Sequence, residues 1–297
     1  MCMTCRSPAK ARITGLDKGG NMSRILRHNV GPVEVTVLTD GKGQFTHAHF
    51  PDTDPAQIDA LLATAGKEVI ETEFNAFMVR NGDEVTLIDT GAGTLMGPIA
   101  GHLPQALAEA GVTPDQVTRI FITHMHPDHC GGAITAVGQP AFKNASLAIS
   151  AVEHAHYSNP DDFTGRGARA EDAFRLAETV FAAYADRIQP LSGAAEIAAG
   201  LTMVPLHGHT KGHSGVHIVA GSDELMIVAD IIHAVDLQLA DPGVAVMFDM
   251  DSDMAATARK HMLDQLARDG IACTGGHFLY PGIRRIERAG AGYRFTA

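Results

Sequence analysis

Four potential metal ligands occupy a span of six residues in the segment FITHMHPDHCGG. They are His124, His126, Asp128 and His129. Imidazole and carboxylate donors without thiolates suit Zn, Mn, Co or Fe in a hydrolytic site. On a turn that leaves a strand, alternate side chains point to one side while His129 reaches an adjacent position, so the segment can serve two metal ions. The pattern therefore predicts a binuclear metal centre.

A binuclear centre needs more ligands, and the sequence supplies candidates further along the chain. The segment LHGHTKGHSG carries His207, His209 and His213, and the first two remain alternatives at this point. Asp230 closes the apolar run LMIVAD, and His277 follows two glycines. Each position lies where a predicted strand meets a loop, which is where the active sites of α/β proteins gather.

The elements that must position these residues are short strands alternating with helices. Runs rich in β-branched or apolar residues predict strands at 33–38, 74–79, 84–89, 119–123, 146–150, 201–204, 216–220 and 224–229. Helical patterns lie at 54–66, 103–111, 168–185 and 251–270, the last with Asp251 or Ser252 as its cap and Gly270 as its stop. This order predicts two β-sheet layers with helices outside. Region 154–170 is the most loop-like interior segment and a candidate lid or pocket rim.

The amino-acid composition argues against several classes of protein. The net charge of −11, with 23 Lys and Arg against 34 Asp and Glu, argues against nucleic-acid or anionic-membrane partners. The apolar runs are too short to span a bilayer, and the N-terminus lacks the apolar region of a secretion signal, so we expect a cytoplasmic protein. Four cysteines are too few for a disulfide scaffold.

The length of 297 residues fits one large α/β domain, and no linker divides the chain. We expect residues 26–297 to form a single hydrolase domain and residues 1–25 to be disordered or extended. Cys2 and Cys5 form a C-x-x-C in that first segment, which we interpret as part of a frayed terminus.

Taken together, the motifs resemble the metallo-β-lactamase superfamily. H-x-H-x-D-H, G-H-T-x-G-H-S, A-D and G-H follow one another in that superfamily's order, spread over residues 85–282. The resemblance implies an α/β fold of the αββα type, with two mixed β-sheets and helices on the outer faces.

The resemblance also implies two divalent transition-metal ions, with zinc expected and manganese, cobalt or iron as alternatives. It assigns the first metal to His124, His126 and His209, and the second to Asp128, His129 and His277. Asp230 would bridge the two ions.

Further residues match supporting or pocket positions. Asp89, in TLIDTGAG, matches the strand-end aspartate that supports the ligand loop from behind, and His213 matches a structural histidine. The candidates for the substrate pocket form a largely apolar set compatible with a lactone or aryl ester. They are Met96, Tyr157, Phe174, His233 and Phe248.

Residues 75–295 are most similar to the methyl parathion hydrolase-like group within the superfamily, through NAFMVRNGDEVTLIDTGAG and HFLYPGIRRIERAGAGYRF. This resemblance implies that a metal-bridging hydroxide attacks lactones, aryl or carboxyl esters, or phosphotriesters. Asp230 would fix the metal spacing and Asp128 would steer the proton, which makes both catalytic. Because the chain has no tryptophan and no cationic cluster is apparent near the pocket residues, we expect small neutral lactones or esters to be preferred over organophosphates.

Alternatives remain open. A glyoxalase II-like thiolester hydrolase would usually have a helical C-terminal domain, whereas this chain ends within 20 residues of His277. True β-lactamases of this fold lack an aspartate at the position of Asp230, and oxygen-reducing di-iron relatives carry glutamate at that of His126. A non-catalytic metal-binding protein of the same fold is the remaining alternative. The resemblance also suggests a homodimer.

Overall fold

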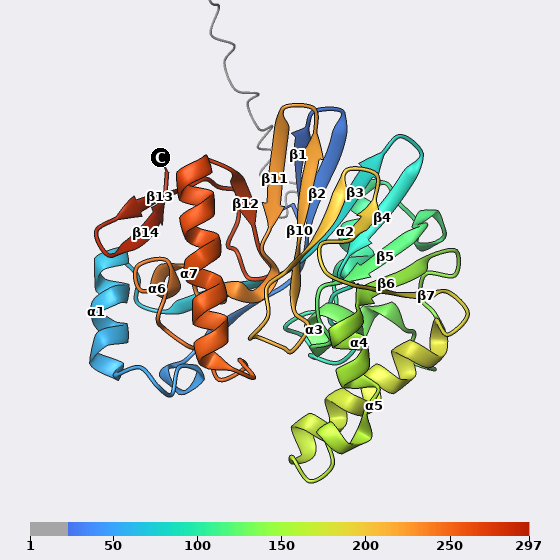
Figure 1. Cartoon of the computed structure of the whole chain (residues 1–297), viewed down its shortest axis with the longest axis horizontal. Helices are drawn as coiled ribbons and strands as arrows, with labels where there is room; N and C mark the ends of the chain where they lie inside the picture. The colour runs from blue at the N-terminus through green and yellow to red at the C-terminus, as the bar shows by residue number, and fades with distance from the viewer. Residues whose placement is uncertain (1–22, 297) are drawn as a thin grey trace, which may run out of the picture.

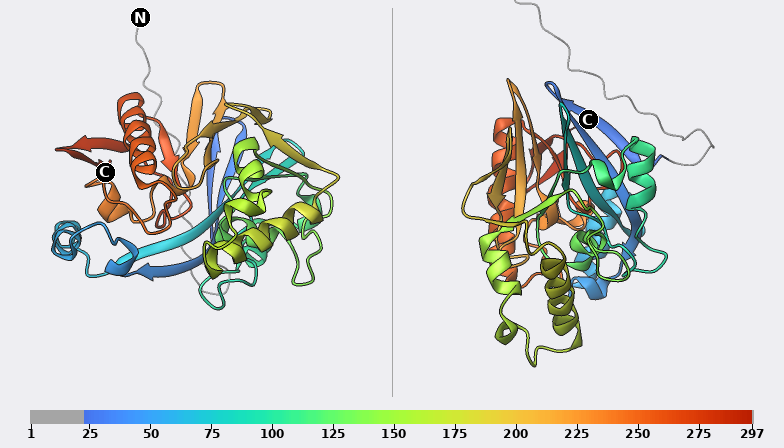
Figure 2. Two further views of the ribbon diagram at one scale, coloured as in Figure 1. Left: turned by 60° about the horizontal axis from the view of Figure 1, so that its bottom comes forward. Right: turned by 90° about the vertical axis from the view of Figure 1, so that its right-hand side faces the viewer.

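The computed structural model describes residues 23–296 (Figure 1). The predictions for the first 22 residues, including the C-x-x-C of Cys2 and Cys5, lie outside the described residues. Two β-sheets face each other, and helices cover their outer faces (Figure 2). The predicted αββα sandwich is confirmed.

The first sheet has seven strands in the order β1-β2-β3-β4-β5-β6-β7. Strands β1 to β4 pair antiparallel and β4 to β7 pair parallel. The strands are β1 (Ile25–Val30), β2 (Val33–Phe45), β3 (Ile70–Asn81), β4 (Glu84–Ile88), β5 (Arg119–Ile122), β6 (Ser146–Ser150) and β7 (Ile188–Leu191).

The second sheet has five strands in the order β12-β11-β10-β9-β8, and only β11 and β12 pair parallel. Its strands are β8 (Glu196–Ala198), β9 (Leu201–Pro205), β10 (Ser214–Ala220), β11 (Asp223–Ile227) and β12 (Ala272–Thr274). A separate hairpin pairs β13 (Ile286–Ala289) with β14 (Gly292–Phe295). All eight predicted strands are confirmed, although β2 and β3 are longer than the predicted 33–38 and 74–79.

The four predicted helices are also confirmed. They are α1 (Pro55–Ala65), α2 (Leu103–Ala110), α5 (Ala168–Ala183) and α7 (Ser252–Asp269). The side chain of Asp251 caps α7 by accepting from the Met254 amide, and Gly270 ends it in the left-handed conformation. Shorter helices are α3 (Pro127–Cys130), α4 (Ala151–Tyr157) and α6 (Val235–Gln238), and 3₁₀ turns are η1 (His47–His49), η2 (Pro114–Gln116), η3 (Gly131–Ala133), η4 (Pro160–Asp162) and η5 (Ala229–Ile231). Region 154–170 is therefore less loop-like than predicted, because α4 and α5 occupy its two ends.

The central strands of the first sheet, β3 to β6, are largely buried on both faces. Along β3, Phe77 and Val79 belong to the core between the sheets, whereas Ala76 and Met78 belong to the core under α2. Successive side chains of a strand point to opposite faces, so a strand covered on both sides is apolar throughout. The second sheet is covered on its outer face by α7 (Figure 1). Within residues 23–296, no helix has the length and apolar character needed to cross a membrane.

The ends of two parallel strand pairs place the candidate ligands. Strands β4 and β5 run parallel, and Asp89 and His124 follow their carboxyl ends. Strands β11 and β12 also run parallel, and Asp230 and His277 follow theirs. Because the carboxyl ends of parallel strands lie at the same edge of a sheet, each sheet delivers its ligands to one edge of the sandwich.

Candidate metal centre

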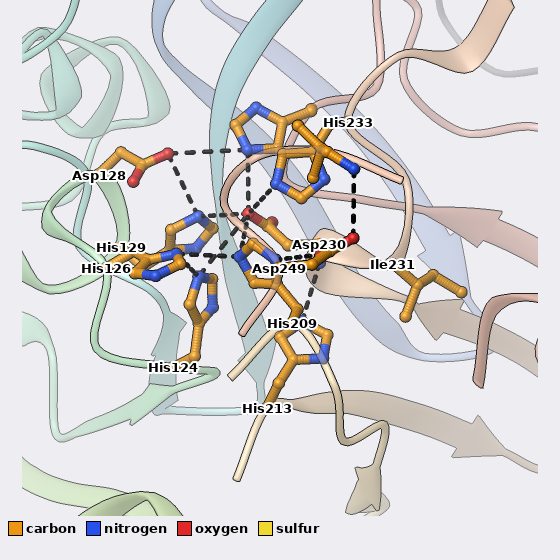
Figure 3. Close-up of polar contacts among 12 residues, drawn as sticks. His124, His126, Asp128, His129, His209, His213, Asp230, Ile231, His233 and Asp249 are labelled. Carbon is orange, nitrogen blue, oxygen red and sulfur yellow. Dashed lines mark hydrogen bonds and ion pairs between the residues drawn. The ribbon is translucent and has the colours of Figure 1, made fainter. Parts of the chain in front are cut away.

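Five imidazole nitrogens surround one carboxylate oxygen, Oδ2 of Asp230 (Figure 3). Asp230 follows β11 and is buried. Its Oδ2 lies 3.0 Å from His277 Nε2, 3.1 Å from His129 Nε2, 3.3 Å from His233 Nε2, 3.6 Å from His209 Nε2 and 3.7 Å from His124 Nε2. A single oxygen in contact with ligands from both sheets is the arrangement that a bridging carboxylate requires.

Three histidines form what we call the imidazole group, His124, His126 and His209. The Nδ1 of His126 lies 3.1 Å from His124 Nε2 and 2.9 Å from His209 Nε2. Burial lowers the pKa of His126 to about 3 and the pKa values of the other two well below the usual range. All three rings are therefore neutral at neutral pH, and each has one N–H and one lone pair.

The outward contacts of two of these rings fix where their lone pairs point. The Nδ1 of His209 lies 2.9 Å from Asp249 Oδ1, a carboxylate that only accepts, so this nitrogen carries the proton. The Nδ1 of His124 lies 3.1 Å from Thr123 Oγ1, whose hydroxyl donates to Asp89, so it too carries the proton. Both Nε2 lone pairs consequently face the Nδ1 of His126. One N–H could satisfy only one of them, whereas a cation would satisfy all three nitrogens.

The remaining ligands form what we call the carboxylate group: Asp128, His129, Asp230 and His277. The Nδ1 of His129 donates to Asp89 Oδ2 at 2.8 Å, and that of His277 donates to the Glu73 carbonyl at 2.9 Å. Both Nε2 atoms therefore face Asp230. Asp128 Oδ2 lies 3.4 Å from His129 Nε2 and 3.7 Å from His277 Nε2.

Charge is distributed differently in this second group. Burial opposes the charge of His129, but the carboxylates of Asp230 and Asp128 prevail and raise its pKa well above the usual value. The pKa of His277 is also raised, because Asp230 outweighs burial. Burial would raise the pKa of Asp230, yet His129 and His277 hold it well below its usual range. The carboxylate group thus holds ion pairs where the imidazole group holds none.

The donor set fits two transition-metal ions. Ligand atoms of His124, His126 and His209 lie within 4.8 Å of one another, as do those of Asp128, His129, Asp230 and His277. Two buried atoms in the centre, Asp230 Oδ1 and His129 Nε2, have no hydrogen-bond partner among the described residues. Imidazole nitrogens and carboxylate oxygens that converge in this way suit a divalent transition metal such as zinc.

Two supporting residues lie where the resemblance places them. Asp89 Oδ1 accepts from the Thr123 amide, and its Oδ2 accepts from the Thr123 hydroxyl as well as from His129, each at 2.8 Å. His213 donates from Nδ1 to the Leu206 carbonyl at 2.7 Å and accepts at Nε2 from the Asp230 amide at 3.0 Å. Asp89 thus fixes the ring of His129, and His213 fixes the backbone at Asp230.

Glycine is required immediately before His277. A Cβ built on Gly276 would collide with Asp230 Oδ1 and would lie 3.0 Å from His129 Cε1. The second residue of the G-G-H segment therefore lets the backbone approach the centre closely.

Of the two alternatives left open upstream, His209 lies in the centre, whereas His207 lies outside the ligand clusters.

Sequence reasoning missed a buried ion pair behind His209. The carboxylate of Asp249 is fully buried, and its Oδ2 lies 3.7 Å from Nη2 of Arg259, which is itself fully buried on α7. The guanidinium of Arg259 also donates to the carbonyls of Ile231, Pro242 and Val244. This ion pair thereby links α7 to His209 and to Ile231, the residue after Asp230. Neither residue belongs to a motif, so the sequence carried no signal for them.

Glu153 was missed as well. It lies in the first turn of α4 and is fully buried. Its Oε1 accepts from the Met125 amide at 3.0 Å, and its Oε2 accepts from Thr210 Oγ1 and the Gly212 amide at 2.8 Å. Burial raises the pKa of Glu153 to about 7 against the pull of these three donors. The carboxyl group ties together the two loops that carry the imidazole group.

A cavity of about 940 Å³ opens onto the candidate metal ligands. His126, Asp128, Asp230 and His277 line it together with the apolar side chains Phe45, Phe74, Leu95, Met96, Ile99, Ala173, Leu176 and Phe248. Met96, His233 and Phe248, three of the residues predicted for the pocket, are part of this lining. The loop that carries Met96 is anchored by buried Asp40, which accepts from the Ala92, Gly101 and Leu103 amides.

Two predictions about the pocket are wrong. Tyr157 is 1% exposed and packs with Phe163 in the core under the first sheet, and Phe174 packs against the same core. The face of α5 towards the cavity carries positions 169, 172, 173, 175, 176 and 179, and Phe174 lies on the opposite side of the helix. The expectation that no cationic cluster lies near the pocket is also wrong, since Arg169 and Arg175 both line it.

Comparisons with known proteins agree with this geometry. Residues 74–277 match the family described as the metallo-beta-lactamase superfamily. The structure is similar to that of AidC, a dizinc quorum-quenching lactonase in complex with a product, N-hexanoyl-L-homoserine. The TM-score is 0.86 at 26% identity, over 92% of this chain and 97% of that chain.

Two further comparisons differ in extent. The hydrolase AbOPH, of the beta lactamase superfamily, gives a TM-score of 0.85 at 25% identity, over 93% of this chain and 97% of that chain. Ribonuclease Z of Pyrococcus furiosus is 38% identical over 70 residues, which are 23% of this chain and 20% of that protein. The chain thus covers only a fifth of the length of this curated relative.

Proposed function

Because the chain belongs to the metallo-β-lactamase superfamily, we propose that it is a metal-dependent hydrolase of lactones and of related aryl or carboxyl esters. The observation that carries the proposal is the convergence of ligands from both sheets on Asp230 Oδ2, at the floor of an apolar cavity. The product-bound lactonase AidC, similar over nearly the whole chain, supports lactones as the first class to test.

We assign one ion to the imidazole group and one to the carboxylate group, with Asp230 shared between them. When bound, a pair of zinc-type ions lowers the pKa of water towards neutrality and polarises an acyl oxygen. The side chain of Asp128 is 16% exposed and lines the cavity, so its carboxylate can accept a proton beside the reacting carbonyl. The apolar walls hold the acyl chain and exclude bulk water from the floor.

His233 is a candidate for orienting the substrate. Its ring stacks on that of His277 at 4.6 Å, and its Nε2 lies 3.3 Å from Asp230 Oδ2. It lines the cavity, and its buried Nδ1 has no hydrogen-bond partner among the described residues. The ring of His233 therefore forms part of the wall against which the substrate would lie.

The proposal is tested with a substrate panel on zinc-reconstituted protein. We expect N-hexanoyl- and N-decanoyl-L-homoserine lactones and p-nitrophenyl esters to give higher kcat/KM than methyl parathion, paraoxon, β-lactams or glutathione thiolesters. Chelation should abolish turnover. Dominant thiolester turnover would instead favour the glyoxalase II-like alternative, and carboxyl-ester activity that survives complete metal removal would overturn the metal-dependent mechanism.

A matched pair of variants compares a histidine of the candidate centre with a histidine outside it. His209→Gln removes one inward-facing nitrogen and should abolish both turnover and binding of one metal ion. His207→Gln changes a histidine two residues away that lies outside the ligand clusters, so turnover should be retained. Protein that binds two ions but cleaves nothing in the panel would favour the non-catalytic alternative.

A further inference from the structure

The cavity extends well beyond the metal ligands. Its volume of about 940 Å³ lies near the upper end of the roughly 300–1,000 Å³ that ligand pockets occupy. Helix α5, which projects away from the two sheets in Figures 1 and 2, contributes one wall. Apart from the carboxylates Asp128 and Asp230 of the candidate metal centre, the formal charges of the lining lie on this wall, on Arg169, Asp172 and Arg175.

The two arginines of this wall are not equivalent. Arg175 is neutralised within its own helix, since its Nη2 lies 2.6 Å from Asp172 Oδ1 and its Nη1 lies 3.9 Å from Glu171 Oε2. For Arg169, no carboxylate within residues 23–296 lies within ion-pair distance, and no acceptor there lies within hydrogen-bond distance of its side chain. The α5 wall therefore keeps one positive charge facing the cavity of a protein whose net charge is −11.

The position of Arg169 is defined by an aromatic ring. Its guanidinium carbon lies 4.7 Å from the centroid of Phe248, and that ring lies 6.0 Å from the ring of His233. His233 in turn contacts Asp230. Phe248 and His233 thus separate the cation from the metal ligands. Stacking uses the flat face of a guanidinium and leaves its N–H edge available for an anion.

We propose that Arg169 binds an anionic group at the far end of the substrate's acyl part, so that the site prefers lactones or esters whose acyl chain ends in a carboxylate. This inference rests on the proposed function. A carboxylate matches the forked donors of a guanidinium with two parallel hydrogen bonds. The apolar side chains Phe45, Phe74 and Met96 line the same cavity and can hold the methylene chain between the two polar ends.

The test compares charged and neutral substrates of matched length. The p-nitrophenyl half-esters of glutaric, adipic and suberic acids are paired with the p-nitrophenyl esters of pentanoic, hexanoic and octanoic acids, on zinc-reconstituted protein. We expect the ratio of kcat/KM, charged over neutral, to fall about tenfold in Arg169→Gln. In the matched control Asp172→Asn/Arg175→Gln, which removes both members of the neighbouring ion pair, the ratio should be retained, because the net charge of the wall is unchanged. Added salt should lower the wild-type ratio, since Arg169 is exposed.

A binding measurement separates this inference from the proposed function. The monoanilide of adipic acid has the same terminal carboxylate on an amide that is far harder to cleave, and calorimetry measures its affinity without turnover. Weaker binding to Arg169→Gln than to wild type would support the anion site even if no ester in the panel is cleaved. If the neutral esters are cleaved but the ratio and the anilide affinity are the same in both proteins, the anion site is overturned and the hydrolase stands.

Discussion

The imidazole group and the carboxylate group lie against each other in the same centre but hold charge in different ways. His124, His126 and His209 are kept neutral by burial, and the group contains no anion of its own. His129 and His277 face the carboxylates of Asp128 and Asp230, so the second group neutralises itself.

The residues that hold each group in place from outside reflect that difference in charge. Neutral rings have little to orient them against one another, and the imidazole group is held from behind by two buried carboxyl groups, those of Asp249 and Glu153. In the carboxylate group, Asp89 orients His129, but His277 needs only a backbone carbonyl and a hydroxyl. A ligand set without internal charge thus depends more on distant residues, which the following variants test.

The largest effect should come from Asp230→Asn, because the Oδ2 of this carboxylate lies within 3.7 Å of histidines in both groups. Asparagine keeps the shape but removes the negative charge shared between two cations. We expect turnover to fall on the order of a thousandfold or more, and elemental analysis to find about two ions per wild-type chain but fewer in the variant. Wild-type turnover with a full metal complement would show that Asp230 is not a shared ligand.

The next largest effect should come from Glu153, which links the two loops that carry the imidazole group. Its pKa of about 7 lies above its usual value of 4.5, so the folded protein holds the extra proton between these pH values. By linkage, the free energy of unfolding should fall as the pH rises through this window, by up to about 3 kcal/mol, and should level off above it. In Glu153→Gln this dependence is absent.

Urea unfolding of the metal-free wild type and of Glu153→Gln, at a series of pH values, measures the contribution of Glu153 as a difference. The histidines titrate in both proteins and cancel in that difference. A difference that stays constant between pH 4.5 and 7 would mean that the three donors to Glu153 keep its carboxylate ionised.

Local pattern was enough to predict eight of the fourteen strands within residues 23–296 and to select the candidate ligands that the structure brings together. Apolar runs marked the buried strands, and the spacing H-x-H-x-D-H depends only on a turn that follows one strand. Strands without such a run were missed. Strand β7 contains Pro190 and is largely exposed, and β12 has only three residues, so neither shows a pattern.

What could not be predicted depends on which side chains tertiary packing brings together. Asp249 and Arg259 meet only because α7 packs beside the 242–250 segment. Phe174 was assigned to the pocket by its aromatic character, but the face that α5 presents is decided by the core beneath it. The same orientation of α5 places Arg169 at the cavity.

A matched pair of variants tests whether the two groups have separate supports. Asp249→Asn acts behind His209 in the imidazole group. Asp89→Asn acts directly behind His129 in the carboxylate group and reaches His124 only through Thr123. We expect each to weaken the metal of its own group by about 10- to 100-fold. Competition with a chromophoric chelator measures the two affinities, and cobalt spectra identify which ion is lost. Equal weakening of both ions in both variants would show that the groups are not separable.

The smallest effect should follow from Thr72→Val in the carboxylate group. The Nδ1 of His277 donates to the Glu73 carbonyl at 2.9 Å and lies 3.2 Å from Thr72 Oγ1, so the carbonyl remains when the hydroxyl is removed. Valine keeps the branched shape in β3, and the ring should keep its orientation. We expect the affinity of the second ion to fall by about two- to threefold, the effect of one neutral hydrogen bond. A loss as large as that of Asp249→Asn, measured with the same chelator, would mean that the hydroxyl is the main partner of His277. The two groups would then depend equally on side chains outside them.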